Sequence, residues 1–124
     1  MNNKILIIFI IVLILTIIFH IMYHYSMSSG YMISSSIAKD LLDLKLATTI
    51  DVRTKTEYNV GHYSDTTHIP SGEIDSKSTK QLDKTNIYIV YCNSGQRARK
   101  ATEKLRDLDF KYVYYISGTY LSLK

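Results

Sequence analysis

Residues 87–97 read IYIVYCNSGQR, and they contain the clearest structural signal in the chain. The first five residues are a continuous apolar run, which is typical of a strand buried on both faces of a parallel sheet. The run ends at Cys92. A polar loop then leads into a segment where small and apolar residues recur at helical spacing, namely Ala98, Ala101, Leu105 and Leu108. The stretch predicts a strand, a loop that begins with a cysteine, and a helix.

Three other segments have the composition of short strands: residues 31–33, 49–52 and 112–116. Ile69-Pro70 reads as the end of a further strand. Because these strands alternate with helical patterns, we expect an α/β fold with right-handed crossovers and a mostly parallel central sheet. Functional loops in such a sheet follow the carboxyl ends of the strands. Cys92 is at such a position.

Helix-start signals lie between the predicted strands. Ser36 is a candidate N-cap for a helix, whose buried side would carry Ile37, Leu41, Leu42 and Leu44. Thr54 and Glu57 have the spacing of a capping box and predict the start of a short helix. The polar residues 71–83 have room for one more helix.

The N-terminal residues have a different character. Residues 5–19 read ILIIFIIVLILTIIF and contain one polar residue, Thr16. A helix that is apolar on every side needs lipid or a large protein core, and a chain of 124 residues cannot supply such a core. We therefore expect an N-terminal transmembrane segment over residues 1–30, in contact with the membrane through residues 5–25. A folded domain over residues 31–124 would follow it.

Two interpretations of this segment stay open. It could be a cleaved signal peptide, with Lys4 as its charged start and Ser26-Met27-Ser28 as its cleavage site. The length of the apolar run favours instead an uncleaved, single-pass membrane anchor. Lys4 is the only Lys, Arg, Asp or Glu before Lys39. The positive-inside rule then weakly favours a cytosolic N-terminus and an extracytoplasmic domain.

The composition excludes several classes of protein. The chain is too short for a multidomain enzyme. A single cysteine excludes an intramolecular disulfide and a cysteine-rich zinc site, and the four histidines have no partners at metal-ligand spacing. We expect no metal and no cofactor. The net charge of +4 comes without the interleaved basic and aromatic residues of a nucleic-acid interface, so we expect no nucleic-acid partner.

Residues 92–97 have the features of an anion cradle. Backbone N–H groups at the start of a helix have no partner within the helix, and they favour a bound anion. Gly95 permits a tight backbone curl, and Arg97 adds a positive charge. These features predict that Cys92 is a reactive nucleophile. The simpler alternative is a small buried side chain at the end of a strand.

Five short motifs in order resemble the single-domain rhodanese-like (sulfurtransferase) family. They are Ile50-Asp51-Val52-Arg53, Glu57-Tyr58, Gly61-His62, Ile69-Pro70 and Cys92-x-x-Gly95-x-Arg97. The spacing from Gly61-His62 to Ile69-Pro70 fits the family's GHI-x-GA-x-NIP segment without a gap. Ser117-Gly118 fits its later GG element. The resemblance covers residues 31–124.

This resemblance implies a rhodanese-like three-layer fold and persulfide chemistry. Cys92 would be the catalytic residue, taking sulfur from a thiosulfate-like donor and passing it to a thiol, a protein or another nucleophilic acceptor. The substrate-binding loop would comprise Asn93, Ser94, Gly95, Gln96 and Arg97, with Arg97 helping to bind donor oxyanions. Asp51, Arg53 and Glu57 would form the scaffold of the loop, the first two as a structural ion pair.

The alternative is a catalytically idle rhodanese-like module that binds or regulates a partner at a membrane. Departures from the family pattern favour it: Tyr63, Asp65, Thr66 and His68 replace the usual Ile, Gly, Ala and Asn. Asp109 stands where a glycine normally ends the helix. The related dual-specificity phosphatases have one more residue before the loop arginine, so a phosphatase is disfavoured. Handling of an oxyanion such as arsenate by the same thiolate stays open.

Overall fold

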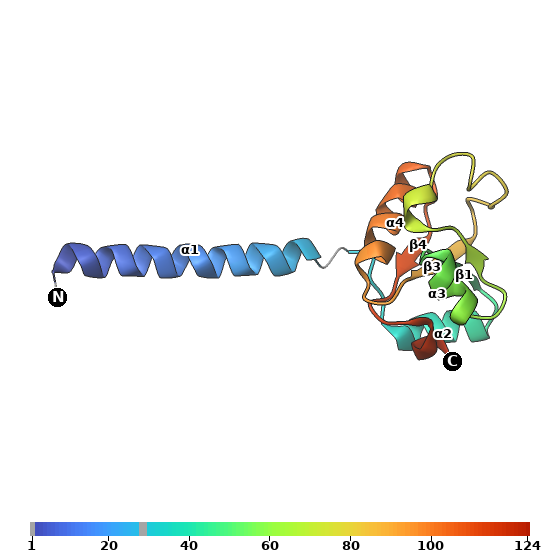
Figure 1. Ribbon diagram of the computed structural model, residues 1–124, viewed down its shortest axis with the longest axis horizontal. Coiled ribbons are helices and arrows are strands. Elements are labelled where there is room, and N and C mark those ends of the chain that lie inside the picture. Colours follow the sequence, from blue (N-terminus) through green and yellow to red (C-terminus); the bar gives the residue numbers. More distant parts are fainter. Residues whose placement is uncertain (1, 28–29) are drawn as a thin grey trace. The chain divides into compact units, whose positions relative to one another are not determined.

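The computed structural model describes residues 2–27 and 30–124, and it divides the chain into two compact units. Met1–Gly30 contains one long helix, and Tyr31–Lys124 contains a sheet with helices on both of its faces (Figure 1).

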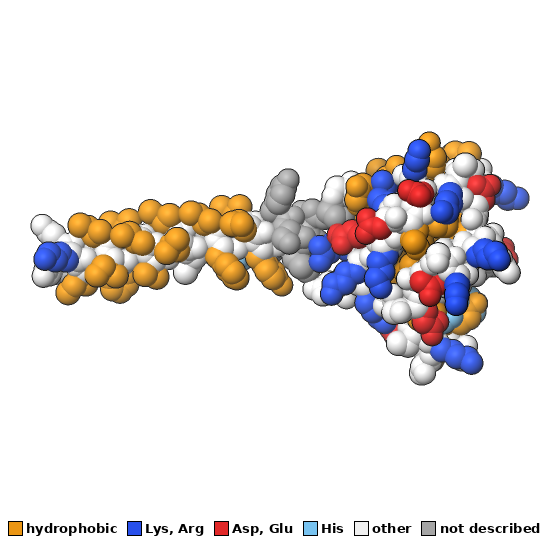
Figure 2. All heavy atoms as spheres, turned by 90° about the horizontal axis from the view of Figure 1, so that it is seen from above, with side chains coloured by type: hydrophobic (Ala, Val, Ile, Leu, Met, Phe, Trp, Pro, Cys, Tyr) orange, Lys and Arg blue, Asp and Glu red, His pale blue; other side chains and the backbone are white. Residues whose placement is uncertain are grey.

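The helix of the first unit, α1, runs over Asn3–Met27. None of the described span Asn3–Tyr23 is buried, and hydrophobic side chains cover its visible face (Figure 2). The span is long and apolar enough to cross a membrane, and an N-terminal signal sequence would have the same length and composition. The candidate cleavage site extends into Ser28, which lies outside the described residues.

The second unit is built on a four-stranded sheet in the order β2-β1-β3-β4, with every pair parallel. The strands are β1 (Ala47–Asp51), β2 (Thr67–His68), β3 (Ile87–Tyr91) and β4 (Val113–Tyr115). The prediction of a mostly parallel sheet is confirmed. The prediction of a strand at residues 31–33 is wrong. Only Met32 pairs with the sheet there, through an isolated bridge to Tyr115 in β4.

Helices alternate with the strands along the chain, beginning with a helix before β1. They are α2 (Ser35–Asp43), α3 (Lys55–Val60) and α4 (Gln96–Asp107), with short 3₁₀ helices η1 (Ser71–Glu73) and η2 (Tyr120–Leu123). The capping box is confirmed, since Thr54 and Glu57 each accept a hydrogen bond from the other's backbone N–H. Within residues 71–83 the helix is only the three residues of η1.

The expected start and buried side of α2 need correction. Ser34, not Ser36, is the N-cap, and its hydroxyl accepts a hydrogen bond from the Ile37 N–H. Ile37 and Leu44 are 54% and 68% exposed, whereas Ala38 is fully buried. Ile37 and Leu44 are seven residues apart and therefore lie on the same side of the helix. This side is about 100° around the helix axis from Ala38. The packed face is instead centred on Ala38, with Leu41 and Leu42 beside it.

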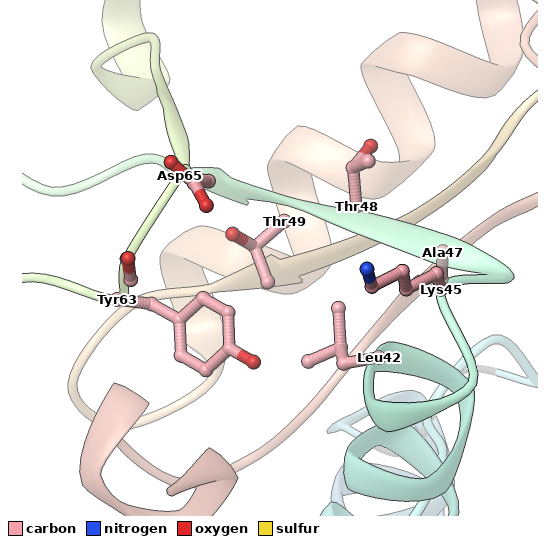
Figure 3. Close-up of a pocket in the computed structure, with 8 residues that line it drawn as sticks. Leu42, Lys45, Ala47, Thr48, Thr49, Tyr63 and Asp65 are labelled. Carbon is pink, nitrogen blue, oxygen red and sulfur yellow. The ribbon is translucent and has the colours of Figure 1, made fainter.

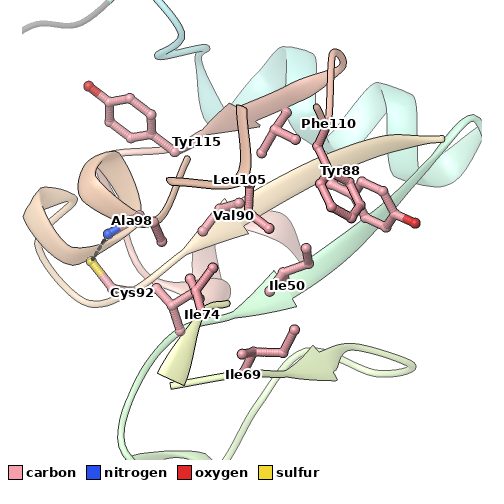
Figure 4. Close-up of a cluster of buried hydrophobic side chains, with 13 residues drawn as sticks. Ile50, Ile69, Ile74, Tyr88, Val90, Cys92, Ala98, Leu105, Phe110 and Tyr115 are labelled. Carbon is pink, nitrogen blue, oxygen red and sulfur yellow. Dashed lines mark hydrogen bonds between the residues drawn. The ribbon is translucent and has the colours of Figure 1, made fainter. Parts of the chain in front are cut away.

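Alternation along the strands divides the core between two faces of the sheet. On the face covered by α4, Ile50, Val90, Leu105 and Phe110 belong to one cluster (Figure 4). On the opposite face, α2 and η2 cover a second cluster. Its buried members are Ala38, Ala47, Ile89, Tyr91, Ile116 and Leu123. Both clusters lie within Tyr31–Lys124, so this unit has a core of its own.

The end of α4 has a left-handed residue at the position where the family usually has a glycine. Asp109 has φ 70°, in the left-handed region that glycine usually occupies. The chain then reverses, and the Phe110 N–H donates to the Leu105 carbonyl over 3.1 Å. The Phe110 ring packs edge-on against Tyr88, with 5.9 Å between ring centroids.

Leu105→Ala tests the contribution of the α4 face to stability. Leu105 is fully buried, so the truncation leaves a cavity and should lower the free energy of unfolding by about 2–5 kcal/mol. The measurement is urea denaturation of residues 30–124 followed by circular dichroism. Leu121 is 60% exposed, and Leu121→Ala should change stability by no more than about 0.5 kcal/mol. Equal losses in the two variants would contradict this description of the core.

Candidate active site

Cys92 lies at the carboxyl end of β3, and its side chain is buried. Its sulfur accepts a hydrogen bond from the Gly95 N–H at 3.1 Å. It accepts a second one from the Ala98 N–H at 3.4 Å (Figure 4). Gly95 is the N-cap of α4 and has no side chain to cap the helix. The Cys92 sulfur therefore accepts from a free N–H of the first turn, where the helix dipole favours negative charge.

Gly95 is required at its position for two reasons. Its φ is 92°, which side chains with a Cβ rarely adopt. In addition, a Cβ there would lie 2.9 Å from the Ser117 Cα. The loop thus packs closely against the segment that follows β4. Asn93, Ser94 and Gln96 are exposed, whereas Gly95 is buried.

Glu57 connects α3 to this loop. Its carboxylate accepts hydrogen bonds from both terminal nitrogens of Arg97, at 2.7 and 3.0 Å, and from the Asn93 side-chain amide. Hydrogen bonds, chiefly from Arg97 and further from Thr54, lower the pKa of Glu57 from 4.5 to about 2. The pKa of Arg97 is raised, mainly by Glu57 and further by the nearby Cys92. The ion pair therefore holds the Arg97 guanidinium in place, close enough to Cys92 for the two side chains to interact.

Asp51 and Arg53 form a buried ion pair at the end of β1. Their side chains are 0% and 5% exposed, and Arg53 Nη2 lies 2.8 Å from Asp51 Oδ2. Arg53 Nη2 also donates to the Gly61 carbonyl at 2.6 Å. The Tyr91 hydroxyl donates to Asp51 at 2.7 Å and accepts from the Tyr63 N–H at 3.1 Å. Burial and the hydrogen bond to Asp51 together raise the pKa of Tyr91.

The structure brings the predicted residues together in two groups. Glu57, Asn93 and Arg97 contact one another around the loop. Asp51 and Arg53 form a separate network with Tyr91. Tyr91 and Cys92 are successive residues at the end of β3, so their side chains point to opposite faces of the sheet. This network therefore lies on the face of the sheet opposite the sulfur.

Several residues of this scaffold were not predicted from the sequence. The Tyr58 ring stacks on His62 and His68, with centroid distances of 3.8 and 4.2 Å and nearly parallel planes. Two rings this close to a third must lie on its opposite faces. His68 Nε2 also hydrogen-bonds the Arg53 carbonyl at 2.8 Å. The stack joins α3 to β2. Its only sequence signal is His68 in place of the family's Asn.

Among the side chains that the structure describes, in residues 2–23 and 30–124, no group of three or more His, Cys, Asp or Glu is arranged to hold a metal ion. The chemistry available at the site is that of the Cys92 sulfur, the N–H groups around it and the Glu57–Arg97 pair.

Comparisons with known proteins identify relatives of the domain. The tRNA uridine(34) hydroxylase of Sodalis glossinidius is 31% identical over 94 residues, which cover 72% of this chain and 27% of that enzyme. A rhodanese-related protein from Thermoplasma volcanium is 28% identical, with a TM-score of 0.62 and coverage of 74% of this chain and 88% of that one. A human single-domain sulfurtransferase shares the fold at 20% identity, with a TM-score of 0.64 and coverage of 76% and 95%.

The chain spans about a quarter of the length of the Sodalis enzyme, so the match concerns only a part of that relative. The family model for the rhodanese-like domain matches residues 34–124. This match covers most of the chain, including all four strands and the Cys92 loop. The chain belongs to the rhodanese-like domain family.

Proposed function

We propose that this protein is a membrane-anchored sulfurtransferase that carries sulfane sulfur as a persulfide on Cys92. The observation that carries the proposal is the position of the Cys92 sulfur. It accepts two backbone hydrogen bonds at the N-terminus of α4, where a thiolate or a persulfide anion is stabilised. The family membership supports a sulfurtransferase-type activity.

The reaction would proceed in two displacements. The Cys92 thiolate attacks the outer sulfur of a thiosulfate-like donor, a new S–S bond forms, and sulfite leaves with the electron pair of the broken bond. An acceptor such as cyanide or a thiolate then attacks the terminal sulfur of the persulfide. The Cys92 thiolate is released with the electron pair of that S–S bond. Because Cys92 is the chain's only cysteine, the acceptor must come from another molecule.

The loop would contribute binding rather than further covalent steps. The Gly95 and Ala98 N–H groups would hold the negative charge of the terminal sulfur. Arg97 would attract the donor's oxyanion while Glu57 keeps its guanidinium in place. Asp51, Arg53 and Tyr91 would fix the end of β3 from the opposite face.

The anchor part of the proposal rests on α1. The span Asn3–Tyr23 is long and apolar enough to cross a membrane, and we propose that it stays attached as a single-pass anchor. Sodium carbonate extraction of membranes that contain the full chain would leave an anchored protein in the pellet. A cleaved signal peptide would instead give a shorter, extractable protein.

The hydroxylase activity in the name of the Sodalis relative is not part of this proposal. The matching segment covers 27% of that enzyme, and most of the relative has no counterpart in this chain. What the two proteins share is the rhodanese-like domain.

Intact mass spectrometry after incubation with thiosulfate tests the persulfide directly. The full chain in detergent micelles should gain the mass of one sulfur atom, and cyanide should remove it. Cys92→Ser should gain nothing, because a hydroxyl cannot form the persulfide. A folded wild-type protein that gains no sulfur from thiosulfate or from a small persulfide donor would support the idle binding module instead.

Glu57→Gln tests the role of the ion pair with Arg97. The variant keeps the size of the side chain and removes its charge, so Arg97 loses its fixed position. We expect sulfur loading to become about tenfold slower, equivalent to one lost charge-assisted hydrogen bond. The matched control is Glu103→Gln, because Glu103 pairs with Arg99 on α4 at 3.6 Å. Equal loading rates for Glu57→Gln and Glu103→Gln would refute this role.

Stability should depend on pH through the same ion pair. The pKa of Glu57 is lowered from 4.5 to about 2 in the folded state. Its contribution to the free energy of unfolding is therefore complete above about pH 4.5 and is lost as the pH falls toward 2. The difference in urea midpoint between wild type and Glu57→Gln should shrink between about pH 6 and about pH 3. A difference that stays constant over this range would contradict the assignment.

A further inference from the structure

The positive charge of the domain is concentrated in one stretch of sequence. Residues 97–111 contain six Lys or Arg and three Asp or Glu, whereas the rest of Tyr31–Lys124 contains eight of each. The excess therefore comes from α4 and the turn that follows it. Four of the six basic side chains have no ion-pair partner within 4.0 Å among the described residues. These four are Lys100, Lys104, Arg106 and Lys111.

Acidic side chains offset only part of this charge. Glu103 pairs with Arg99 on α4 at 3.6 Å. Asp107 and Asp109 form no ion pair within the part of the chain that the structure describes, and they oppose the four cations. Two net positive charges therefore remain on this side of the domain, where the three lysines are exposed and the arginine is half-buried.

Arg106 joins this stretch to the first residues of the domain. Its Nε and Nη2 donate to the Val113 carbonyl at 3.0 and 2.7 Å. Its guanidinium carbon lies 3.6 Å from the centre of the Tyr31 ring and 5.1 Å from that of Tyr114. Guanidinium groups favour such contacts with aromatic rings. Tyr31, the end of α4 and β4 therefore form one continuous surface.

Large apolar side chains are exposed on the same surface. Tyr31, Met32 and Tyr112 are 37%, 45% and 46% exposed. Met32 pairs with Tyr115 in β4, and Tyr112 immediately precedes this strand. Tyrosines are enriched at membrane–water interfaces, and anionic lipid headgroups attract Lys and Arg. The surface has both of these features.

The chain connection holds this surface near the membrane that α1 is proposed to cross. The candidate span ends at Tyr23, and α1 ends at Met27. Residues 28–30 then lead to Tyr31, and even a fully extended connection from Met27 to Tyr31 reaches only about 14 Å. Tyr31 is therefore tethered close to the lipid headgroups, where its effective concentration is high.

We propose that this surface docks on anionic lipid headgroups. The proposal rests on the α1 anchor of the proposed function and needs no sulfur chemistry. The basic side chains would contact lipid phosphates, while Tyr31, Met32 and Tyr112 would enter the interface. The Cys92 loop lies at the start of α4, and Arg106 lies about 15 Å further along this helix. Docking at the end of α4 would leave the loop open to an acceptor.

Lysine acetylation in lipid nanodiscs tests the docking with the full chain. One set of discs contains phosphatidylcholine alone, and the other also contains phosphatidylglycerol. Each net positive charge favours an anionic surface about fivefold, so two charges favour docking about 25-fold. Lys111 should therefore be acetylated about tenfold more slowly in the phosphatidylglycerol discs. The internal reference is Lys124, which follows η2 on the α2 side of the sheet.

Peptide mass spectrometry gives both acetylation rates from the same sample. Equal ratios of the Lys111 rate to the Lys124 rate in the two sets of discs would overturn the proposal.

A double variant, Lys100→Gln with Lys104→Gln, tests the role of charge. It cancels the two net charges, so the protection of Lys111 in phosphatidylglycerol discs should be lost. The matched control, Lys45→Gln with Lys55→Gln, changes the net charge equally. Lys45 lies beside a cavity of about 320 Å³ on the α2 side of the sheet (Figure 3), and Lys55 begins α3. Equal protection of Lys111 in the two double variants would refute docking by charge.

Incorporation into the discs separates this proposal from the proposed function. A chain that does not enter the discs would overturn the anchor and the docking together. A chain that enters the discs without protection of Lys111 would overturn the docking alone. Sulfur loading of Cys92, measured in the same discs, tests the persulfide independently of both.

Discussion

The structure of the site depends on one constraint: the free N–H groups at the start of α4 need an acceptor, and the sulfur of Cys92 supplies it. For the sulfur to reach them, β3 must end at Tyr91 and the chain must turn within three residues. The turn is possible because Gly95 adopts φ 92° against Ser117. The same hydrogen bonds that begin the helix therefore also place two N–H donors on the sulfur, as the proposed persulfide chemistry requires.

Alternation at the end of β3 places two successive side chains on opposite faces of the sheet. Cys92 belongs to the cluster under α4, whereas Tyr91 belongs to the cluster under α2. Tyr91 joins the buried Asp51–Arg53 pair, which would be costly to bury without such partners. On the exposed side, Glu57 holds Asn93 and Arg97. Glu57 thus holds two residues of the loop, and the Tyr91 network holds the end of β3 on the opposite face.

Local sequence patterns predicted the elements well where one physical signal dominated. The apolar run of β3, the Thr54–Glu57 capping box and the left-handed Asp109 are all as expected. Residues 34–36 are three successive serines, and any of them could be the N-cap of α2. The N-cap is Ser34 in the helix whose Ala38 packs against the sheet. The contact between Tyr91 and Asp51 could not be predicted, because the two residues are 40 positions apart and only the β1–β3 register brings them together.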